Sequence, residues 1–530
     1  MESDYLNLSR AGDLKDPKEK ILYRFFEILP GLLSWGTLGG AFILAWLAPV
    51  VIAIFIIVFD LYWLLKISYL AWHQLASYRQ MKKNLKINWI EKLHRLPNPE
   101  GMKVEMKANS EGGKLHRLSS KNDIYHLIIL PMYKEGIEIV RPTFQSLVDS
   151  EYPKDKMIVV LATEERAGEI AQKIAKAIKK ELGKIFFQFL ITVHPQNIIG
   201  EIAGKGSNEA WAIKKAKEKI IDPLKIPYEN IIVSGFDIDT RVYPQYFSCL
   251  TYHYLTTKKP LRTSYQPIPV YNNNIWDAPA FSRVISTSST FWQMMQQERP
   301  EQLVTYSSHS MPFKIFEEVG YPNNMVSDDS RIFWCSFLYY NSDYRVIPLY
   351  YPVSMDAVMA KNLPRTIVNQ YKQQRRWAWG AENIPYLLYG FLKNKKISLF
   401  EKLRHSFIIL EGFWSWATAA LLIFFLGWLP LILGGEEFNV TLLSYNLPRL
   451  TGNIMTVAMI GMIVSAIISL LLLPPRPSGY SRWKNLFMVL QWLLLPVTLI
   501  AFGTFPALDA QTRLMLNKPL GFSVTEKTRK

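Results

Sequence analysis

Cysteine is scarce in this sequence, and its scarcity excludes two kinds of stabilised fold. The 530 residues contain two cysteines, Cys249 and Cys335, which are too few for a disulfide framework or a zinc site. Both stand in apolar surroundings, so we expect them to pack in a core in a reducing compartment. No internal repeat is visible along the chain.

Charge is scarce in two long stretches, residues 29–72 and 405–508, which are rich in apolar runs. Residues 73–400 have the composition of a soluble protein instead. Because about 20 apolar residues cross a bilayer, the first stretch predicts a hairpin of two crossings that turns near Pro49. The second stretch predicts three apolar segments, at 406–432, 453–473 and 485–507. The chain is therefore expected to be a soluble domain framed by membrane segments.

A cleaved signal peptide is not expected. The first apolar stretch is too long, it follows a charged lead of about 25 residues, and it lacks an obvious small-residue cleavage site.

Acidic residues are outnumbered, at 44 against 61 Lys and Arg, and the resulting excess of +17 lies beside the apolar stretches. The basic residues that flank these stretches are Lys82, Lys83, Lys86, Lys92, Arg95, Lys393, Lys395, Lys396, Lys402 and Arg404. By the positive-inside rule they place the domain between them in the cytoplasm, with Glu436 and Glu437 in a loop on the opposite side. Charge in this position is more typical of contact with lipid headgroups than with nucleic acid. Membrane lipids are therefore expected as partners, and nucleic acid is not.

Between the apolar stretches, short apolar runs alternate with helical patterns. The runs cover residues 125–131, 157–163, 186–193 and 231–236. Strands that alternate with helices predict an α/β domain with a mostly parallel sheet and a nucleotide-sized crevice at the carboxyl ends of its strands. A Gly and Lys loop after the third run leads into a helix from about Ser207.

The fourth run ends in two carboxylates, Asp237 and Asp239. At the carboxyl end of a strand, such groups can hold a hard divalent cation against a diphosphate. The same Asp-x-Asp-Thr sequence is typical of a simple turn cap, so this motif is weak by itself.

Two later stretches carry further candidates. MVSDDSRIFW places Asp328 and Asp329 at the start of a helix, where carboxylates also serve as caps at the positive end of the helix dipole. NQYKQQRRWAWG places Gln373, Arg376 and Trp377 on a helix, a pattern that equally fits an interfacial anchor before a membrane crossing.

Taken together, these stretches resemble the membrane-embedded family-2 glycosyltransferases with a GT-A fold, the group that holds cellulose, chitin and hyaluronan synthases. The resemblance covers residues 120–400 and the flanking membrane layout, and the motifs come in the same order. It implies that the nucleotide-sugar site includes Pro131, Tyr133, Glu135, Glu164, Lys205 and Asp237. It also implies a metal-binding DxD, matched by Asp237 and Asp239, and a catalytic base, matched by Asp329. The acceptor or diphosphate site that it implies is matched by Asp328, Gln373, Arg376 and Trp377.

The tail adds a further match, because Phe522, Val524, Thr525 and Lys527 form FxVTxK. This pattern is similar to the gating loop that cellulose synthases lower over the occupied site. A gating tail must be cytoplasmic, whereas three simple crossings after 405 would place it outside. Since Pro496 lies near the middle of 485–507, that segment could be broken or re-entrant and return to the same face.

Three features depart from the family pattern. Glu164 and Glu165 stand where the family usually has an Asp that contacts the uracil or ribose, which leaves the base preference open. SDD replaces TED and keeps both acids. The stretch TYSSHSMPF differs from the acceptor-side counterpart of cellulose synthases, and its His309 fits a packed or hydrogen-bonded residue as well as a contact.

The implied chemistry needs charge neutralisation on a departing diphosphate and a base for the acceptor hydroxyl. Asp239, helped by Asp237, would hold Mg²⁺ or Mn²⁺ as the cofactor. Lys205 and Arg376 would add positive charge, and Asp329 would be the base of a direct, inverting displacement. Trp377 would form a stacking floor for the acceptor sugar.

The expected function is a plasma-membrane, multi-pass, inverting and metal-dependent hexosyltransferase with a cytoplasmic catalytic domain. It would transfer a sugar from a nucleoside-diphosphate donor, expected to be UDP-linked, to a growing polysaccharide that is exported. The alternatives are single addition to a lipid-linked acceptor and a non-catalytic membrane protein with a degenerate nucleotide fold. The expected divisions are a cytoplasmic lead (1–28), a transmembrane hairpin (29–72), a basic interfacial and connector segment (73–122), the catalytic domain (123–365), QxxRW and interfacial helices (366–404), a membrane bundle (405–508) and a cytoplasmic gating-like tail (509–530). Residues 1–25 are expected to be loosely ordered, and residues 73–90 to continue as a basic helix on the membrane surface.

Overall fold

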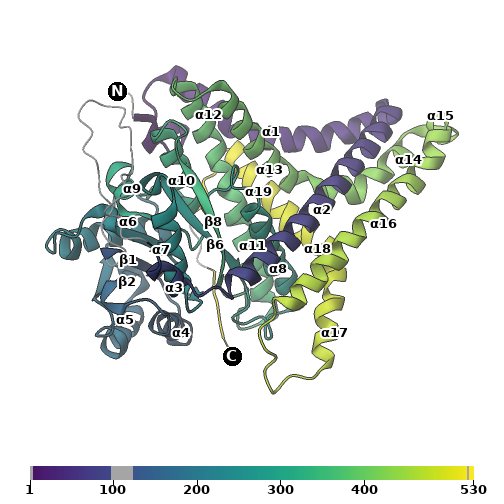
Figure 1. Ribbon diagram of the computed structural model, residues 1–530. Coiled ribbons are helices and arrows are strands. Elements are labelled where there is room, and N and C mark those ends of the chain that lie inside the picture. Colours follow the sequence, from purple (N-terminus) through teal and green to yellow (C-terminus); the bar gives the residue numbers. More distant parts are fainter. Residues whose placement is uncertain (1–3, 97–122, 522–524, 530) are drawn as a thin grey trace.

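The computed structural model describes residues 4–96, 123–521 and 525–529, which form two parts (Figure 1). An α/β domain lies on one side, and long helices extend away from it on the other. The connector residues 97–122 and the tail residues Phe522 and Val524 lie outside the described residues.

The α/β domain is built on one mixed sheet. Among the described residues it has eight strands: β1 (Tyr125–Met132), β2 (Met157–Glu164), β3 (Gln188–His194), β4 (Ile231–Gly235), β5 (Arg241–Val242), β6 (Thr263–Val270), β7 (Ser310–Pro312) and β8 (Arg345–Ser354). Their order across the sheet is β3-β2-β1-β4-β7-β6-β8-β5. The first four are parallel, whereas the short β7 runs antiparallel to β4 and β6. β8 pairs parallel with β6 and antiparallel with β5.

Helices cover both faces of this sheet, so its apolar runs are buried on both sides. One core lies under α4 (Ile137–Val148), α5 (Glu169–Leu182) and α7 (Tyr246–Thr256). The other lies under α6 (Lys205–Ala216), α10 (Asp328–Tyr339) and α12 (Asn383–Lys393). Cys249 packs in the first core and Cys335 in the second, each as a free thiol. The remaining helices of this part are α3 (Trp89–His94), α8 (Ala280–Gln297), α9 (Phe313–Glu318) and α11 (Leu363–Ala378).

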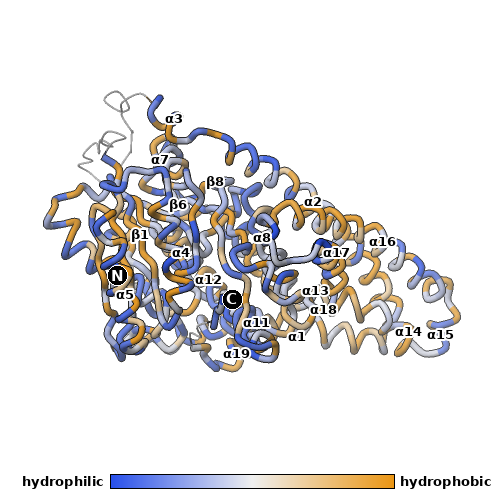
Figure 2. The backbone as a smooth tube through the Cα atoms, turned by 90° about the horizontal axis from the view of Figure 1, so that it is seen from below, coloured by the Kyte–Doolittle hydropathy of each residue, from blue (hydrophilic) through white to orange (hydrophobic). Residues whose placement is uncertain are grey.

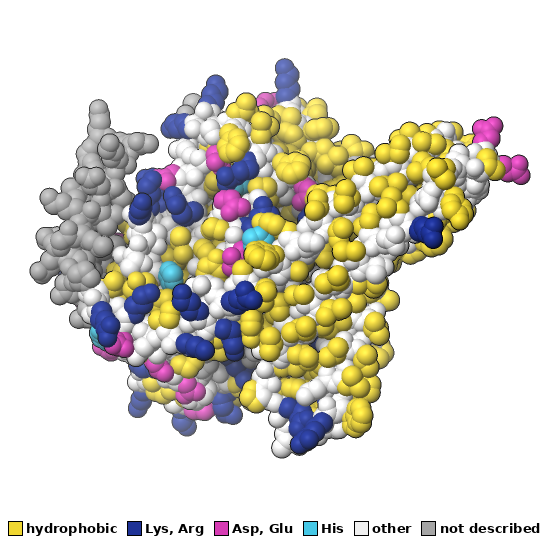
Figure 3. Space-filling view, turned by 45° about the vertical axis from the view of Figure 1, so that its right-hand side comes forward, with side chains coloured by type: hydrophobic (Ala, Val, Ile, Leu, Met, Phe, Trp, Pro, Cys, Tyr) yellow, Lys and Arg dark blue, Asp and Glu magenta, His cyan; other side chains and the backbone are white. Residues whose placement is uncertain are grey.

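Five segments among the described residues are long and apolar enough to cross a membrane. They are α1 (Pro17–Leu47), α2 (Pro49–Asn84), α13 (Leu399–Phe425) with α14 (Leu429–Leu433), α16 (Leu442–Leu471), and the run from α17 (Trp483–Leu490) through α18 (Leu495–Thr498) to α19 (Phe505–Met515). Apolar residues dominate the long helices in Figure 2. Figure 3 shows an apolar surface over these helices, with acidic side chains at the far tip, where α15 (Gly435–Asn439) carries Glu436 and Glu437. The α/β class with apolar helices at both ends is therefore confirmed.

The first two long helices differ in extent from the expected hairpin. The chain does break next to Pro49, but α1 begins at Pro17, where the Asp16 side chain accepts a hydrogen bond from the Lys18 amide. α2 continues without interruption to Asn84, into the segment expected to lie on the membrane surface. The part of the lead expected to be loosely ordered is also packed, since Leu8 and Ala11 are buried against the domain.

The last apolar segment is broken, as its proline suggested. A 3-10 turn (Gln491–Leu494) precedes α18, and π-helical turns (Leu499–Thr504) precede α19. The later part of the segment lies beside the α/β domain: the rings of Phe281 and Phe502 stack at 5.3 Å, and Arg375 forms an ion pair with Asp509 at 2.8 Å. From the 3-10 turn onward the segment packs on α8 and α11 at the base of the long helices, whereas its first helix, α17, packs on α16 (Figure 1).

Candidate active site

The two carboxylates of the DxD motif lie directly after β4, at the carboxyl edge of the parallel strands. Phe236 and Ile238, which alternate with them in the sequence, are buried in the core, so Asp237 and Asp239 point away from that core. Asp239 is fully buried, and its Oδ2 accepts hydrogen bonds from the Asp356 amide (2.8 Å) and Lys527 Nζ (2.6 Å). Its Oδ1 has no partner among the described residues.

An unpaired, buried carboxylate oxygen is what a site for a hard cation requires, because Mg²⁺ and Mn²⁺ take oxygen ligands. Asp237 Oδ2 already accepts a hydrogen bond from Ser307 Oγ at 2.8 Å. The DxD residues thus fit a divalent cation chemically. A second acidic group, Glu209, Asp328 and Asp329, brings one oxygen from each side chain within 4.8 Å of the others.

Lys205 joins the DxD motif to the SDD motif. It is the first residue of α6, and its Nζ lies 2.8 Å from Asp329 Oδ1 and 2.9 Å from Asp237 Oδ1. Burial alone would lower the pKa of Lys205, but the charges of Asp237 and Asp329 outweigh it and raise this pKa well above its usual value. The lysine therefore carries a fixed positive charge between the two motifs.

Close packing brings α6 and α10 together at this point. A Cβ on Gly206 would lie 2.8 Å from both Asp328 Cβ and the Pro322 carbonyl oxygen. Only glycine allows the lysine-bearing turn to approach α10 so closely.

Asp328 and Asp329 are the first two residues of α10, as expected from their sequence. The Thr305 hydroxyl donates to the Asp329 carbonyl oxygen at 2.6 Å, and His309 Nδ1 lies 3.8 Å from Asp329 Oδ1. Burial and the charge of Asp329 raise the pKa of Asp328. The TYSSHSMPF stretch, expected on the acceptor side, thus contacts the carboxylates of both motifs.

The carboxyl ends of β1 and β2 hold the other residues predicted to bind the nucleotide. Glu135 accepts a hydrogen bond from the Tyr133 amide at 2.8 Å, and Arg166 pairs with Glu164. The Arg166 guanidinium also lies 4.7 Å from the centre of the Tyr133 ring. Pro131 is the last residue but one of β1 and lies opposite Ala162 of β2.

The helix with Gln373, Arg376 and Trp377 closes another side of the site. The Trp377 ring lies 6.4 Å from that of Tyr271, which follows β6. Burial and the charges of Asp237 and Asp239 raise the pKa of the Tyr271 phenol, and the charge of Arg376 opposes this shift. Gln373 is buried and its Oε1 accepts from Gln370 at 3.2 Å.

The C-terminal tail enters the same site. Besides the contact between Lys527 and Asp239, Arg529 forms a two-bond ion pair with Asp356, at 2.7 and 3.1 Å. The Thr528 amide donates to the Met359 carbonyl at 2.9 Å. Thr525 is partly buried, and the other two residues of FxVTxK lie outside the described part.

Sequence reasoning missed five residues that contact or adjoin the predicted ones: Arg166, Tyr271, Ser307, Asp356 and Arg529. A weak signal existed for Tyr271 and Asp356, because each comes just after a strand, where ligand-binding residues gather. Ser307 and Arg529 gave no local signal, since their partners are distant in the sequence. Arg166 pairs with the nearby Glu164, but an acid followed closely by an arginine is too common to mark a site.

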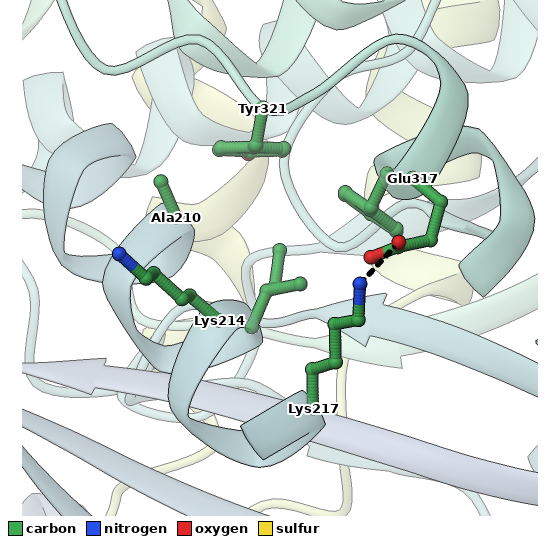
Figure 4. A pocket seen from close by; sticks show the side chains of 7 residues that line it. Ala210, Lys214, Lys217, Glu317 and Tyr321 are labelled. Carbon is green, nitrogen blue, oxygen red and sulfur yellow. Dashed lines mark hydrogen bonds and ion pairs between the residues drawn. The ribbon is translucent and has the colours of Figure 1, made fainter. Parts of the chain in front are cut away.

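A small hollow of about 210 Å³ lies behind α6, between this helix and α9 (Figure 4). Its lining includes Lys217 paired with Glu317, and Tyr321, whose hydroxyl donates to Glu209 at 2.6 Å. None of the predicted site residues lines this hollow.

A sequence model of the family described as "Glycosyl transferase family group 2" matches residues 232–504. No curated protein matches the chain. Among solved structures, the chain is similar to the mannosyltransferase PcManGT from Pyrobaculum calidifontis in complex with GDP-Man and Mn²⁺, with 13% identity, a TM-score of 0.39, and 87% of this chain and 98% of that chain covered. It is also similar to S. aureus TarS 1–349 in complex with UDP-GlcNAc, with 9% identity, a TM-score of 0.36, and coverage of 74% and 93%. Similarity at this level assigns neither a donor nor an acceptor.

Proposed function

The chain belongs to glycosyl transferase family group 2, whose match spans more than half of its length, and from this premise we propose that it is an inverting, metal-dependent sugar transferase. The donor is a nucleoside-diphosphate sugar, expected to be UDP-linked, and the product is a growing polysaccharide. The observation that supports this most is the position of Lys205, which bonds at once to the metal-side Asp237 and to the proposed base Asp329.

The residues divide the reaction between them. A cation held by Asp239 and Asp237 would neutralise the leaving diphosphate when bound. Lys205 and Arg376 add positive charge beside the same position. Asp329 takes the proton of the acceptor hydroxyl, a step that contributes about 10²–10⁴-fold in rate. A single base with direct attack inverts the anomeric centre.

Tyr133, Glu135 and Glu164 would contact the nucleoside, since they lie at the ends of β1 and β2 beside the DxD motif. Trp377 and Tyr271 offer two aromatic rings, and an aromatic face suits the apolar side of a pyranose. We place the acceptor sugar there, next to Asp329.

We further propose that the tail gates this site. Lys527 Nζ bonds to Oδ2 of Asp239, the carboxylate that would also hold a divalent cation. The Lys527 ammonium and a divalent cation on the same carboxylate would repel each other, so the tail must move aside or rearrange when the metal-bound donor enters. Asp356, which Arg529 neutralises at present, would then need another partner.

We propose that the chain is integrated in the plasma membrane through α1, α2, α13 and α16. These helices make two hairpins, so the domain and both ends of the chain lie on one side, and the basic flanks favour the cytoplasm. The acceptor helix α11 packs on α19 at the base of the apolar helices through the pair of Arg375 and Asp509. This position suits an exported chain, and it equally suits the alternative of a lipid-linked acceptor.

The test supplies detergent-purified protein with a panel of nucleotide sugars and Mg²⁺ or Mn²⁺, and follows nucleoside diphosphate release beside Asp329→Asn. Release with one donor, lost in the variant, would support the proposed transferase. Silence with every donor and with added lipid or oligosaccharide acceptors would contradict it. Product length then separates the acceptors, because a lipid carrying one added sugar would overturn polymer synthesis.

A further inference from the structure

One buried carboxylate, Glu382, connects two motifs that are distant in the sequence. α11, which carries QxxRW, ends at Ala378 and is followed by a single 3-10 turn, Trp379–Glu382. The Glu382 side chain points from this turn to the segment that precedes Asp328, and the residue is 7% exposed.

Glu382 accepts four hydrogen bonds. Its Oε1 accepts from the Val326 amide (3.2 Å), the Ser327 amide (2.8 Å) and the Ser327 hydroxyl (2.6 Å). Its Oε2 accepts from Trp379 Nε1 at 2.8 Å. Ser327 is the N-cap residue of α10 but makes no capping bond of its own. The amides just ahead of a helix need outside partners, and a carboxylate is favoured at this positive end.

The same turn and the residue after it also contact α10 further along, at Ser330 and Arg331. Arg331 is fully buried, and its Nε donates to Asn383 Oδ1 (2.6 Å) while its Nη2 donates to the Glu382 carbonyl (3.1 Å). Asn383 Nδ2 donates to Ser330 Oγ at 2.9 Å. Contacts at residues 326, 327, 330 and 331 therefore surround Asp328 and Asp329 without touching their carboxylates.

On the side of the reaction, Asp329 has few supports of its own. Among the described residues they are Lys205, which the diphosphate would also attract, and His309, whose Nδ1 lies 3.8 Å from Asp329 Oδ1. Thr305 bonds only the main chain of Asp329. The direction of the carboxylate therefore depends on how the first turn of α10 is held from behind.

We propose that Glu382 is a positioning residue, which sets the first turn of α10 against α11 and so aims Asp329 at the acceptor held by Trp377. This role rests on the proposed function. A displacement of about 1 Å in a reacting group can cost about 10²-fold in rate, and Glu382 is the residue whose carboxylate spans the two motifs.

The test compares Glu382→Gln with the unchanged full-length protein in detergent. The amide keeps the volume, but its NH₂ group must face either Trp379 Nε1 or the amides of Val326 and Ser327, all of which are donors. We expect kcat to fall by about 10- to 100-fold. We expect the KM for the donor to stay within about twofold, because Lys205, Asp237 and Asp239 are untouched.

Hydrogen exchange of the Val326 and Ser327 amides supplies a readout that does not need turnover. These amides should exchange faster in Glu382→Gln, while β1 and β2 stay protected. The matched control is Glu318→Gln, because Glu318 contacts Tyr340 at the other end of α10. It should change neither kcat nor exchange at residues 326 and 327.

Three results would overturn the proposal. The first is a kcat of Glu382→Gln that equals that of the wild type, and the second is an exchange rate at residues 326 and 327 that equals that of the wild type. The third is a parallel loss of kcat and donor affinity with exchange raised throughout the domain. A wild-type protein that is silent with every donor would refute the proposed function instead, and exchange would then decide the structural claim alone. If Glu382→Gln does not fold, Trp379→Phe removes the donor to Oε2 together with part of a buried ring. It should lower kcat by about 2- to 5-fold, with KM unchanged.

Discussion

The two ends of the described chain pack on different parts of the α/β domain and make contacts of different chemistry. The segment 4–13 lies behind α10, where its main-chain carbonyls accept hydrogen bonds from buried side chains. Arg331 Nη1 donates to the Leu8 carbonyl at 2.9 Å, and the Tyr386 hydroxyl donates to the Leu6 carbonyl at 3.0 Å. The tail instead lies in front, and its cationic side chains pair with carboxylates of the site.

This difference separates a structural contact from an exchangeable one. Removing a carbonyl that accepts from a buried guanidinium leaves an N–H donor of that charged group without a partner, which is costly. An ammonium on a carboxylate can be replaced by another cation. The N-terminal segment is therefore part of the fold, whereas the contacts of the tail suit the gating role proposed above.

The largest expected effect tests whether the acids between the two ends are the reacting centre. Asp329→Asn should lower nucleoside diphosphate release by about 10²- to 10⁴-fold, because the amide cannot take the acceptor proton. The matched control is Asp343→Asn, in an ion-paired acid of the same domain that contacts Lys259 and Arg262. Equal rates of nucleoside diphosphate release in Asp329→Asn and wild type would contradict the assignment of Asp329 as the base.

The next effect concerns the segment behind α10. Deleting residues 2–13 should destabilise the protein by about 3–5 kcal/mol, since it exposes the surface under Leu8 and removes a partner of buried Arg331. Thermal unfolding in detergent measures this change. The comparison fails if this deletion leaves the unfolding temperature unchanged.

A smaller effect concerns the tail. Lys527→Ala should tighten Mn²⁺ binding without donor by about 3- to 10-fold, because it removes a competing charge from Asp239. Titration calorimetry or the Mn²⁺ resonance signal measures binding directly. Lys518→Ala, in an exposed lysine of the same tail, is the control. Equal Mn²⁺ affinity in the Lys527 variant and wild type would contradict an exchangeable tail.

The smallest effect provides a reference for an ion pair outside the site. Burial alone would raise the pKa of Asp343, but hydrogen bonds from Lys259 and Arg262 outweigh it and lower that pKa. A lowered folded-state pKa contributes stability that is present above the unfolded value, about 3.9, and is lost as pH falls below it. The unfolding temperatures of Asp343→Asn and wild type should therefore converge in acid. A constant difference between pH 7 and pH 3 would contradict this expectation.

Local patterns predicted much of the α/β domain. The runs at 157–163 and 231–236 became β2 and β4, because a continuous apolar segment is stable as a strand covered on both faces. Asp328 starts α10 because acids favour that end of a helix. The extents of α1 and α2 were less predictable, since a helix continues past its apolar part wherever the domain packs against it.

The amino-acid sequence by itself determined the first four strands with the helices between them, the apolar segments, and the placement of acids at the end of β4 and the start of α10. These properties depend on side-chain periodicity and on neighbours within one helical turn. Only the tertiary structure decided which charges meet. Asp239 and the Asp356 amide are 117 residues apart, and Lys205 and Asp329 are 124 apart. Such pairs form only after the sheet brings the strand ends and α6 together, so no local pattern encodes them.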